Sequence, residues 1–101
     1  MMKKISVEGF KLSLSSAEPP EDFSAQEKAL WFAGRGNWEK AHLIVQDLND
    51  TLSYNIHAFL HRQEGDQSNA GYWYHKAGIK MPDISLDCEW EELVSSLNIN
   101  K

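Results

Sequence analysis

The fold is set by residues 51–78, which read TLSYNIHAFLHRQEGDQSNAGYWYHKAG. The first half carries apolar residues at helical spacing and ends at Gly65, a residue type that commonly terminates helices. Asp66 then supplies an N-cap for a second helical segment, which stops at Gly78. The stretch therefore predicts two helices joined by a short turn, that is, an antiparallel helical hairpin.

The first helix of this hairpin, expected from Leu52 or Ser53 to Gln63, has two packing faces. The apolar residues of one face are Leu52, Ile56, Phe59 and Leu60. The residues of the opposite face are Tyr54, His57, Ala58 and His61. A helix with two such faces is usually enclosed between neighbouring helices. The second helix carries one stripe, formed by Ala70, Trp73, Tyr74 and Ala77.

The same pattern occurs 29 residues earlier in the chain. The matching pairs are Ala29 with Ala58, Gly36 with Gly65, Asn37 with Asp66, and Ala41 with Ala70. Ser24 and Glu27 form a capping box for a helix over residues 24–34, and Asn37 caps the next helix, which ends near Leu48. A second hairpin is therefore expected before the first, with small alanines that allow close helix approach.

The two ends of the chain complete the prediction of an all-α fold. Residues 86–97 form an amphipathic helix, expected to cap the repeat. Ser6 can cap a short helix through Leu14, which we favour over a small hairpin turning at Glu8 and Gly9, because an isolated hairpin is marginal. Residues 15–22, with two prolines, then form a linker. The chain divides into an N-terminal segment and linker (1–23) and a helical-repeat domain (24–101), one folding unit overall.

This repeat resembles the tetratricopeptide repeat and its Sel1-like relatives. The second copy matches the first-helix pattern of that family at Tyr54, His57, Ala58 and His61. Its second helix matches at Ala70, Tyr74, Ala77 and Pro82. The first copy matches at Ala29, Phe32, Gly36 and Ala41, without the proline. The resemblance covers residues 24–82 and implies stacked antiparallel helix pairs that bind a protein or peptide partner.

The chain departs from this family in three ways. Its copies lie 29 residues apart, against about 34 in the family, and two copies are fewer than the three usually stacked. His57 and His61 stand where the family favours leucine and tyrosine. Residues 30–97 also resemble small bacterial proteins without an assigned activity, a likeness that supports the helical fold.

The charge distribution argues against nucleic acid as a partner. The net charge is −5, and the ten basic residues are scattered, whereas nucleic-acid modules cluster them. Five acidic residues between Asp83 and Glu92 suit the start of a helix. The lone Cys88 excludes an intramolecular disulfide. With no leader-like or membrane-spanning apolar run, we expect a cytoplasmic protein that does not bind membranes.

The histidines are the strongest candidates for a chemical site. His57 and His61 are four residues apart, a spacing that places two imidazoles on one helix face, as in helical zinc sites. His42 or His75 could supply a third ligand, and Asp47 or Asp66 a carboxylate. The alternative is that both are packed core histidines, hydrogen-bonded to Tyr54, Tyr74 or a backbone carbonyl.

Three further residues are candidates for binding. Arg62 could hold a carboxylate ligand, or pair with an acid such as Glu64 or Asp66. Tyr72, with His75 near the same side of its helix, is expected to be exposed.

The predicted function is a helical-repeat module that binds a protein or peptide, or a second copy of itself as a homodimer. The alternative is a small metal-binding protein or enzyme that uses His42, His57 and His61. No catalytic residue or cofactor is indicated, so a binding module is favoured over an enzyme.

Overall fold

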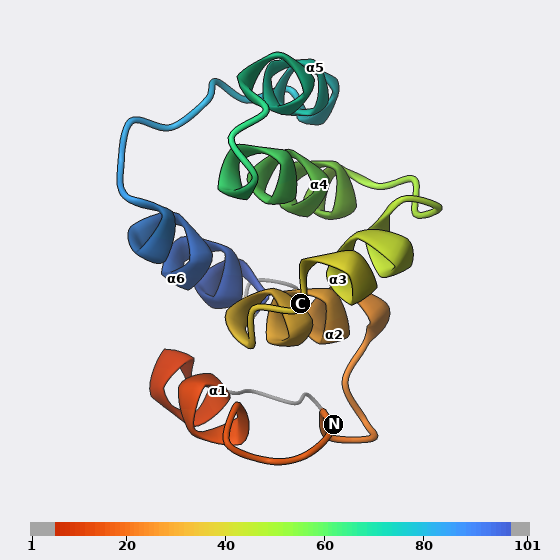
Figure 1. Cartoon of the computed structure of the whole chain (residues 1–101), viewed down its shortest axis with the longest axis vertical. Helices are drawn as coiled ribbons and strands as arrows, with labels where there is room; N and C mark the ends of the chain where they lie inside the picture. The colour runs from red at the N-terminus through yellow and green to blue at the C-terminus, as the bar shows by residue number, and fades with distance from the viewer. Residues whose placement is uncertain (1–5, 98–101) are drawn as a thin grey trace.

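A computed structural model of the chain describes residues 6–97, and six helices lie within them (Figure 1). These are α1 (Val7–Ser13), α2 (Ala25–Gly34), α3 (Trp38–Val45), α4 (Thr51–Gln63), α5 (Gln67–Ala77) and α6 (Leu86–Ser96). No strand occurs in residues 6–97, so the predicted all-α class is confirmed. The basic start of the chain, residues 1–4, lies outside the described range.

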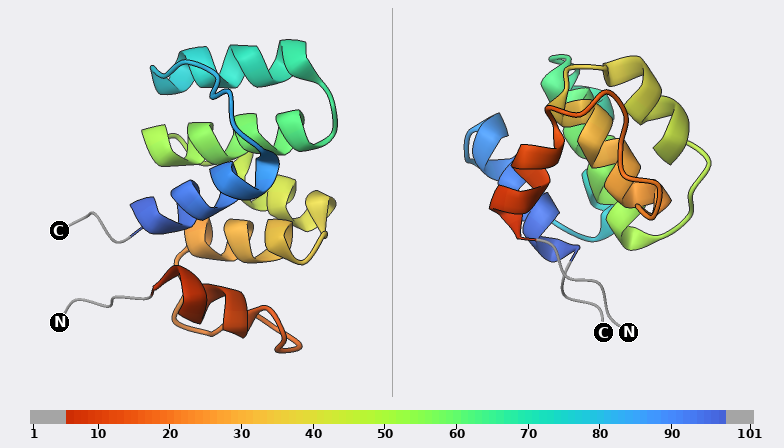
Figure 2. Two further views of the ribbon diagram at one scale, coloured as in Figure 1. Left: turned by 90° about the vertical axis from the view of Figure 1, so that its left-hand side faces the viewer. Right: turned by 90° about the horizontal axis from the view of Figure 1, so that it is seen from below.

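Two helical hairpins form a stack, with the remaining helices beside and below it (Figure 1, Figure 2). Helices α2 and α3 form one hairpin, α4 and α5 form the other, and α4 also contacts both α2 and α3. Helix α6 packs against α2, α4 and α1. It therefore covers the side of the stack, whereas we expected it to cap an end. Among the described helices, none combines the length and the apolar character that crossing a bilayer requires.

The turns inside the two hairpins have the same geometry. Gly36 and Gly65 adopt φ values of 81° and 85°, in the left-handed region where a Cβ is strained. The amide of Asn37 donates to the carbonyl of Phe32 at 2.8 Å. At the matching position, Asp66 donates to the carbonyl of His61 at 2.9 Å. The repeat predicted from a spacing of 29 residues is therefore present in the backbone.

The paired alanines lie inside the packed helices. Ala29, Ala41, Ala58 and Ala70 are all 0% exposed. A larger side chain at any of these positions would separate the helix axes, because a packed interior has no spare volume. The matching turns and the matching small alanines allow the two helices of each hairpin to pack closely.

Helix α1 joins the same apolar core as the hairpins. Ser6 accepts a hydrogen bond from the amide of Gly9, so the helix prediction was right and the alternative hairpin was wrong. Phe10 is fully buried, stacks on Phe23 with ring centroids 5.2 Å apart, and meets Trp90 of α6 edge-on at 5.6 Å. The N-terminal helix is thus fixed to the body of the protein by aromatic packing.

Two helical glycines offer a matched test of how α6 packs on α2. A Cβ built on Gly34 would lie 2.8 Å from Cζ2 of Trp90, whose indole is held by a 2.9 Å hydrogen bond to the carbonyl of Leu30. We expect Gly34→Ala to lower the free energy of unfolding by about 1–3 kcal/mol, the usual cost of overpacking. Urea denaturation followed by circular dichroism measures the change.

Gly71→Ala is the control, since a Cβ there meets nothing within 4 Å. Alanine is the better helix former, so this variant should be up to about 1 kcal/mol more stable than the parent. Equal effects of the two substitutions would contradict the contact between Gly34 and Trp90.

Candidate metal centre

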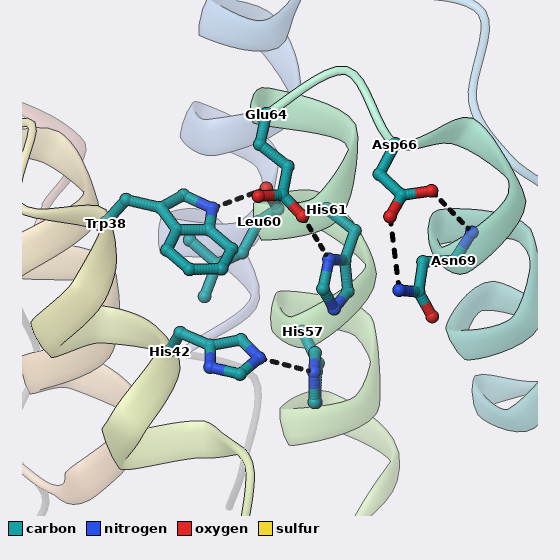
Figure 3. Close-up of polar contacts among 8 residues, drawn as sticks. All are labelled: Trp38, His42, His57, Leu60, His61, Glu64, Asp66 and Asn69. Atoms are coloured by element: carbon teal, nitrogen blue, oxygen red, sulfur yellow. Dashed lines mark hydrogen bonds and ion pairs between the residues drawn. The ribbon is translucent and has the colours of Figure 1, made fainter.

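Three histidine side chains converge between α3 and α4 (Figure 3). His42 comes from α3, whereas His57 and His61 come from α4. One ring nitrogen of each lies within 4.8 Å of the others. Nε2 of His42 is 3.1 Å from Nε2 of His57, so these two rings share a single proton between them. We call these three residues the histidine centre.

The centre depends on the way α3 docks on α4. Helical spacing places His57 and His61 on one face, with their rings stacked at 5.0 Å. Trp38, one turn before His42, donates a hydrogen bond from its indole nitrogen to the carbonyl of Leu60 at 2.6 Å. The same indole stacks on His42 with ring centroids 4.7 Å apart and planes inclined by 9°. Trp38 therefore fixes the position of α3 on α4 and also the orientation of the His42 imidazole.

A second indole covers the centre from α5. The ring of Trp73 stacks on His57 with centroids 3.9 Å apart and planes inclined by 13°. His57 and His61 are only 4% and 7% exposed, while His42 is half-buried. The two tryptophans thus enclose the imidazoles in a largely dry environment, which strengthens electrostatic interactions within it.

A carboxylate orients the third imidazole. Nδ1 of His61 lies 2.8 Å from Oε2 of Glu64, and its other ring nitrogen points toward His57 (Figure 3). This is the arrangement by which metal-ligating histidines are held in one tautomer, because the outer N–H donates to the carboxylate. Asp66 lies close by, but its carboxylate caps α5 by accepting from the backbone and side chain of Asn69.

Burial keeps two of the imidazoles neutral. The pKa of His57 falls from 6.5 to about 4, chiefly because burial penalises its charged form and secondly because His42 and His61 repel a proton there. Burial also lowers the pKa of His42. Nδ1 of His57 is buried with no hydrogen-bond partner in the described residues. At neutral pH both rings are therefore uncharged bases, the form that binds a metal ion.

The dimensions of the centre suit a small divalent metal ion. Zinc binds imidazole nitrogen at 2.0–2.1 Å, so two ligands of a tetrahedral ion lie about 3.3 Å apart. The pair formed by His42 and His57 is already near this separation, at 3.1 Å. The ring nitrogen of His61 lies within 4.8 Å of the other two. A small rotation of its side chain would bring this nitrogen to a ligand-to-ligand distance of about 3.3 Å. Three nitrogen ligands would leave a fourth position for water.

The structure brings together three of the residues singled out from sequence and separates the others. His42 supplies the third imidazole, whereas His75 is exposed and belongs to neither group of potential ligands in the described residues. Tyr72 is 57% exposed, as predicted. Burial of His57 and His61 agrees with the alternative that both are packed core histidines, but their partners are His42 and Glu64 rather than tyrosines or a backbone carbonyl. Asp47 is exposed and takes no part.

Arg62 has a structural role that the sequence did not reveal. Its guanidinium donates to the carboxylate of Glu89 on α6 at 2.5 Å and to the carbonyl of Ile84, rather than pairing with Glu64 or Asp66. Tyr74 donates to the same carboxylate at 2.6 Å. Both acceptor oxygens of a carboxylate only 3% exposed are therefore used, and the network ties α6 to α4 and α5.

Trp38, Glu64 and Trp73 are the parts of the centre that the sequence analysis missed. Two of them had a usable signal, since Trp38 lies four residues before His42 and Glu64 lies three after His61, both neighbouring positions on a helix. Trp73 had none, because its contact with His57 crosses between helices. Comparison of the chain with protein-family models, curated proteins and solved structures gave no significant match. The centre is therefore interpreted from its own geometry.

The depressed pKa of His57 makes stability depend on pH in a defined window. Unfolding restores a pKa near 6.5, so between about pH 6.5 and pH 4 the unfolded chain binds a proton that the folded chain excludes. The free energy of unfolding should therefore fall as the pH is lowered through this window, by about 3 kcal/mol in total. Urea titrations at pH 7, 6 and 5 measure the slope.

A variant without the titrating ring provides the control. His57→Phe keeps an aromatic ring against Trp73 and should reduce the slope between pH 7 and pH 5, leaving the contribution of His42, whose pKa burial also lowers. His75→Phe, which removes an exposed histidine, should leave it as in the parent. If the parent and His57→Phe lose stability equally on acidification, the lowered pKa is wrong.

Proposed function

We propose that this protein binds one divalent transition-metal ion through His42, His57 and His61. The observation that carries the proposal is the convergence of three ring nitrogens, from two separate hairpins, within 4.8 Å of one another. Glu64 on the outer nitrogen of His61 supports it, because such a carboxylate orients a ligating imidazole and raises its basicity.

The donor set favours one class of metal. Imidazole nitrogens suit zinc, copper, nickel and cobalt, whereas magnesium and calcium prefer oxygen ligands. The three rings of the centre contribute nitrogen only, and the lone Cys88 is exposed on α6, away from them. We therefore propose zinc or a neighbouring first-row ion as the ligand, and no reaction is assigned to it.

A metal ion at this centre would join the two hairpins. His42 belongs to the α2–α3 hairpin, whereas His57 and His61 belong to the α4–α5 hairpin. Metal binding would therefore add its free energy to the docking between them. A ligand that binds only the folded state stabilises it in proportion to the logarithm of its concentration above Kd.

Calorimetric titration of tag-free protein with zinc and with cobalt tests this proposal. We expect one ion per chain, with a rise in the thermal midpoint on loading. Replacing any of the three histidines by phenylalanine should weaken binding by more than the 10–100-fold that loss of an outer carboxylate costs. Phenylalanine keeps a planar ring at each position but is larger and cannot bind metal, so circular dichroism is needed to check that each variant is folded.

Two further variants sharpen the result. Glu64→Gln should weaken binding about 10–100-fold while leaving one ion per chain. His75→Phe should bind as the parent does. Failure of the parent to bind a stoichiometric ion, or equal weakening by His75→Phe, would refute the proposal.

A second candidate function is a protein–protein interaction module, including self-association. Leu12 on α1 and Leu43 on α3 are 75% and 61% exposed, so each offers apolar surface to a partner. The repeated hairpins and their resemblance to tetratricopeptide and Sel1-like repeats support this candidate.

Analytical ultracentrifugation of the parent and of Leu43→Glu tests self-association. If α3 forms the interface, the parent should show a concentration-dependent dimer, and a buried charge in Leu43→Glu should abolish it. Lys40→Gln, at an exposed position on the same helix, lowers the net charge by one unit as Leu43→Glu does and is the control for net charge. If the parent is monomeric at all concentrations, self-association is ruled out, and any interaction at this surface must involve a different protein.

A further inference from the structure

Three aromatic rings gather around one ammonium group at the outer edge of the α4–α5 hairpin. The Nζ of Lys76 lies 5.1 Å from the ring centroid of Tyr54, 5.9 Å from that of Tyr72 and 5.1 Å from that of Trp73. Tyr54 comes from α4 and the other three residues from α5. All three distances are within the range in which an aromatic ring attracts a cation, about 6 Å.

The rings form walls at different angles rather than a flat surface. Tyr72 stands at 88° to Trp73 with centroids 5.1 Å apart. Tyr54 is tilted by 39° from Trp73 with centroids 5.8 Å apart. Rings set at such angles present their negative faces to a shared volume from several directions. Tyr72 is 57% exposed, so this volume can be reached from solvent.

Lys76 is held there by the rings and not by an acid. Within residues 6–97, no hydrogen bond or ion pair is formed by its ammonium group, although the chain has fifteen acidic residues. Two other cations of the described residues, Arg35 and Lys40, each lie over one ring, whereas Lys76 lies over three. The concentration of rings is therefore what selects a cation at this position.

We propose that Tyr54, Tyr72 and Trp73 form a binding site for a quaternary ammonium group, which Lys76 fills when no ligand is present. A primary ammonium is compact and strongly hydrated, so it loses much of its solvation on entering an aromatic cage. A methylated ammonium spreads the same charge over a larger, weakly hydrated surface and suits such a cage better. Because Lys76 has no ion pair to break, a ligand can displace it at little cost.

This site is separate from the histidine centre but shares one residue with it. Trp73 stacks on His57 and also lies beneath Lys76. The proposed ammonium site uses no metal ligand, so it stands whether or not the histidines bind metal. The net charge of −5 favours cationic ligands in general, which is why an uncharged analogue is needed in the test.

The test is a titration of metal-free protein with tetramethylammonium, followed by the indole and tyrosine ring signals in NMR spectra. We expect saturable shifts of Trp73, Tyr54 and Tyr72. Lys76→Ala removes the internal competitor and should bind about two- to fivefold more tightly than the parent. Tyr72→Ala in the Lys76→Ala background removes an exposed wall and should weaken binding by about the same factor.

3,3-Dimethylbutan-1-ol, in which carbon replaces the charged nitrogen of choline, is the matched uncharged control and should not bind. Choline and a peptide carrying trimethyllysine distinguish a small molecule from a protein side chain as the source of the group. Preferential binding of either over its unmethylated counterpart supports the proposal. Equal binding of the neutral analogue, or no tighter binding by Lys76→Ala than by the parent, would overturn it.

Discussion

The docking of α3 on α4 is the interaction on which the two hairpins and the histidine centre depend. Trp38 makes it specific, because its indole donates to the carbonyl of Leu60 at 2.6 Å and its face lies against His42. One side chain thus links the packing of the hairpins to the orientation of an imidazole. A shift of α3 along α4 would therefore have two effects at once: it would break the hydrogen bond from Trp38 to Leu60, and it would move His42 away from His57.

Much of the fold follows from local sequence signals. Gly36 and Gly65 end helices because only glycine is unstrained at their positive φ, and Asn37 and Asp66 then cap the next helix. These signals act over a few residues and can be read directly. The position of α6 cannot be predicted in this way, because it is set by contacts such as that between Arg62 and Glu89, which are 27 residues apart. Several acids in the chain could have paired with that arginine.

The histidine centre shows the same division between local and distant contacts. His57 and His61 are four residues apart on one helix, which makes them neighbours on its surface, so that pair was predictable. Whether His42 or His75 joined them depended on which flank of α4 the pair would face, and periodicity alone does not decide this. The stacking of Trp73 on His57 depends on helix-to-helix contact in the same way. Burial, which lowers the pKa of His57, is a property of the assembled fold.

Long-range ¹⁵N–¹H NMR of the histidine rings, with and without one equivalent of zinc, would show whether the three imidazoles bind one metal ion. The spectra report which ring nitrogen carries a proton and which carries a metal. We expect His42, His57 and His61 each to bind zinc through one ring nitrogen, with the outer nitrogen of His61 protonated toward Glu64, while His75 is unchanged. Zinc-dependent changes confined to His75, or none at any of the four rings, would show that the histidine centre does not bind the metal.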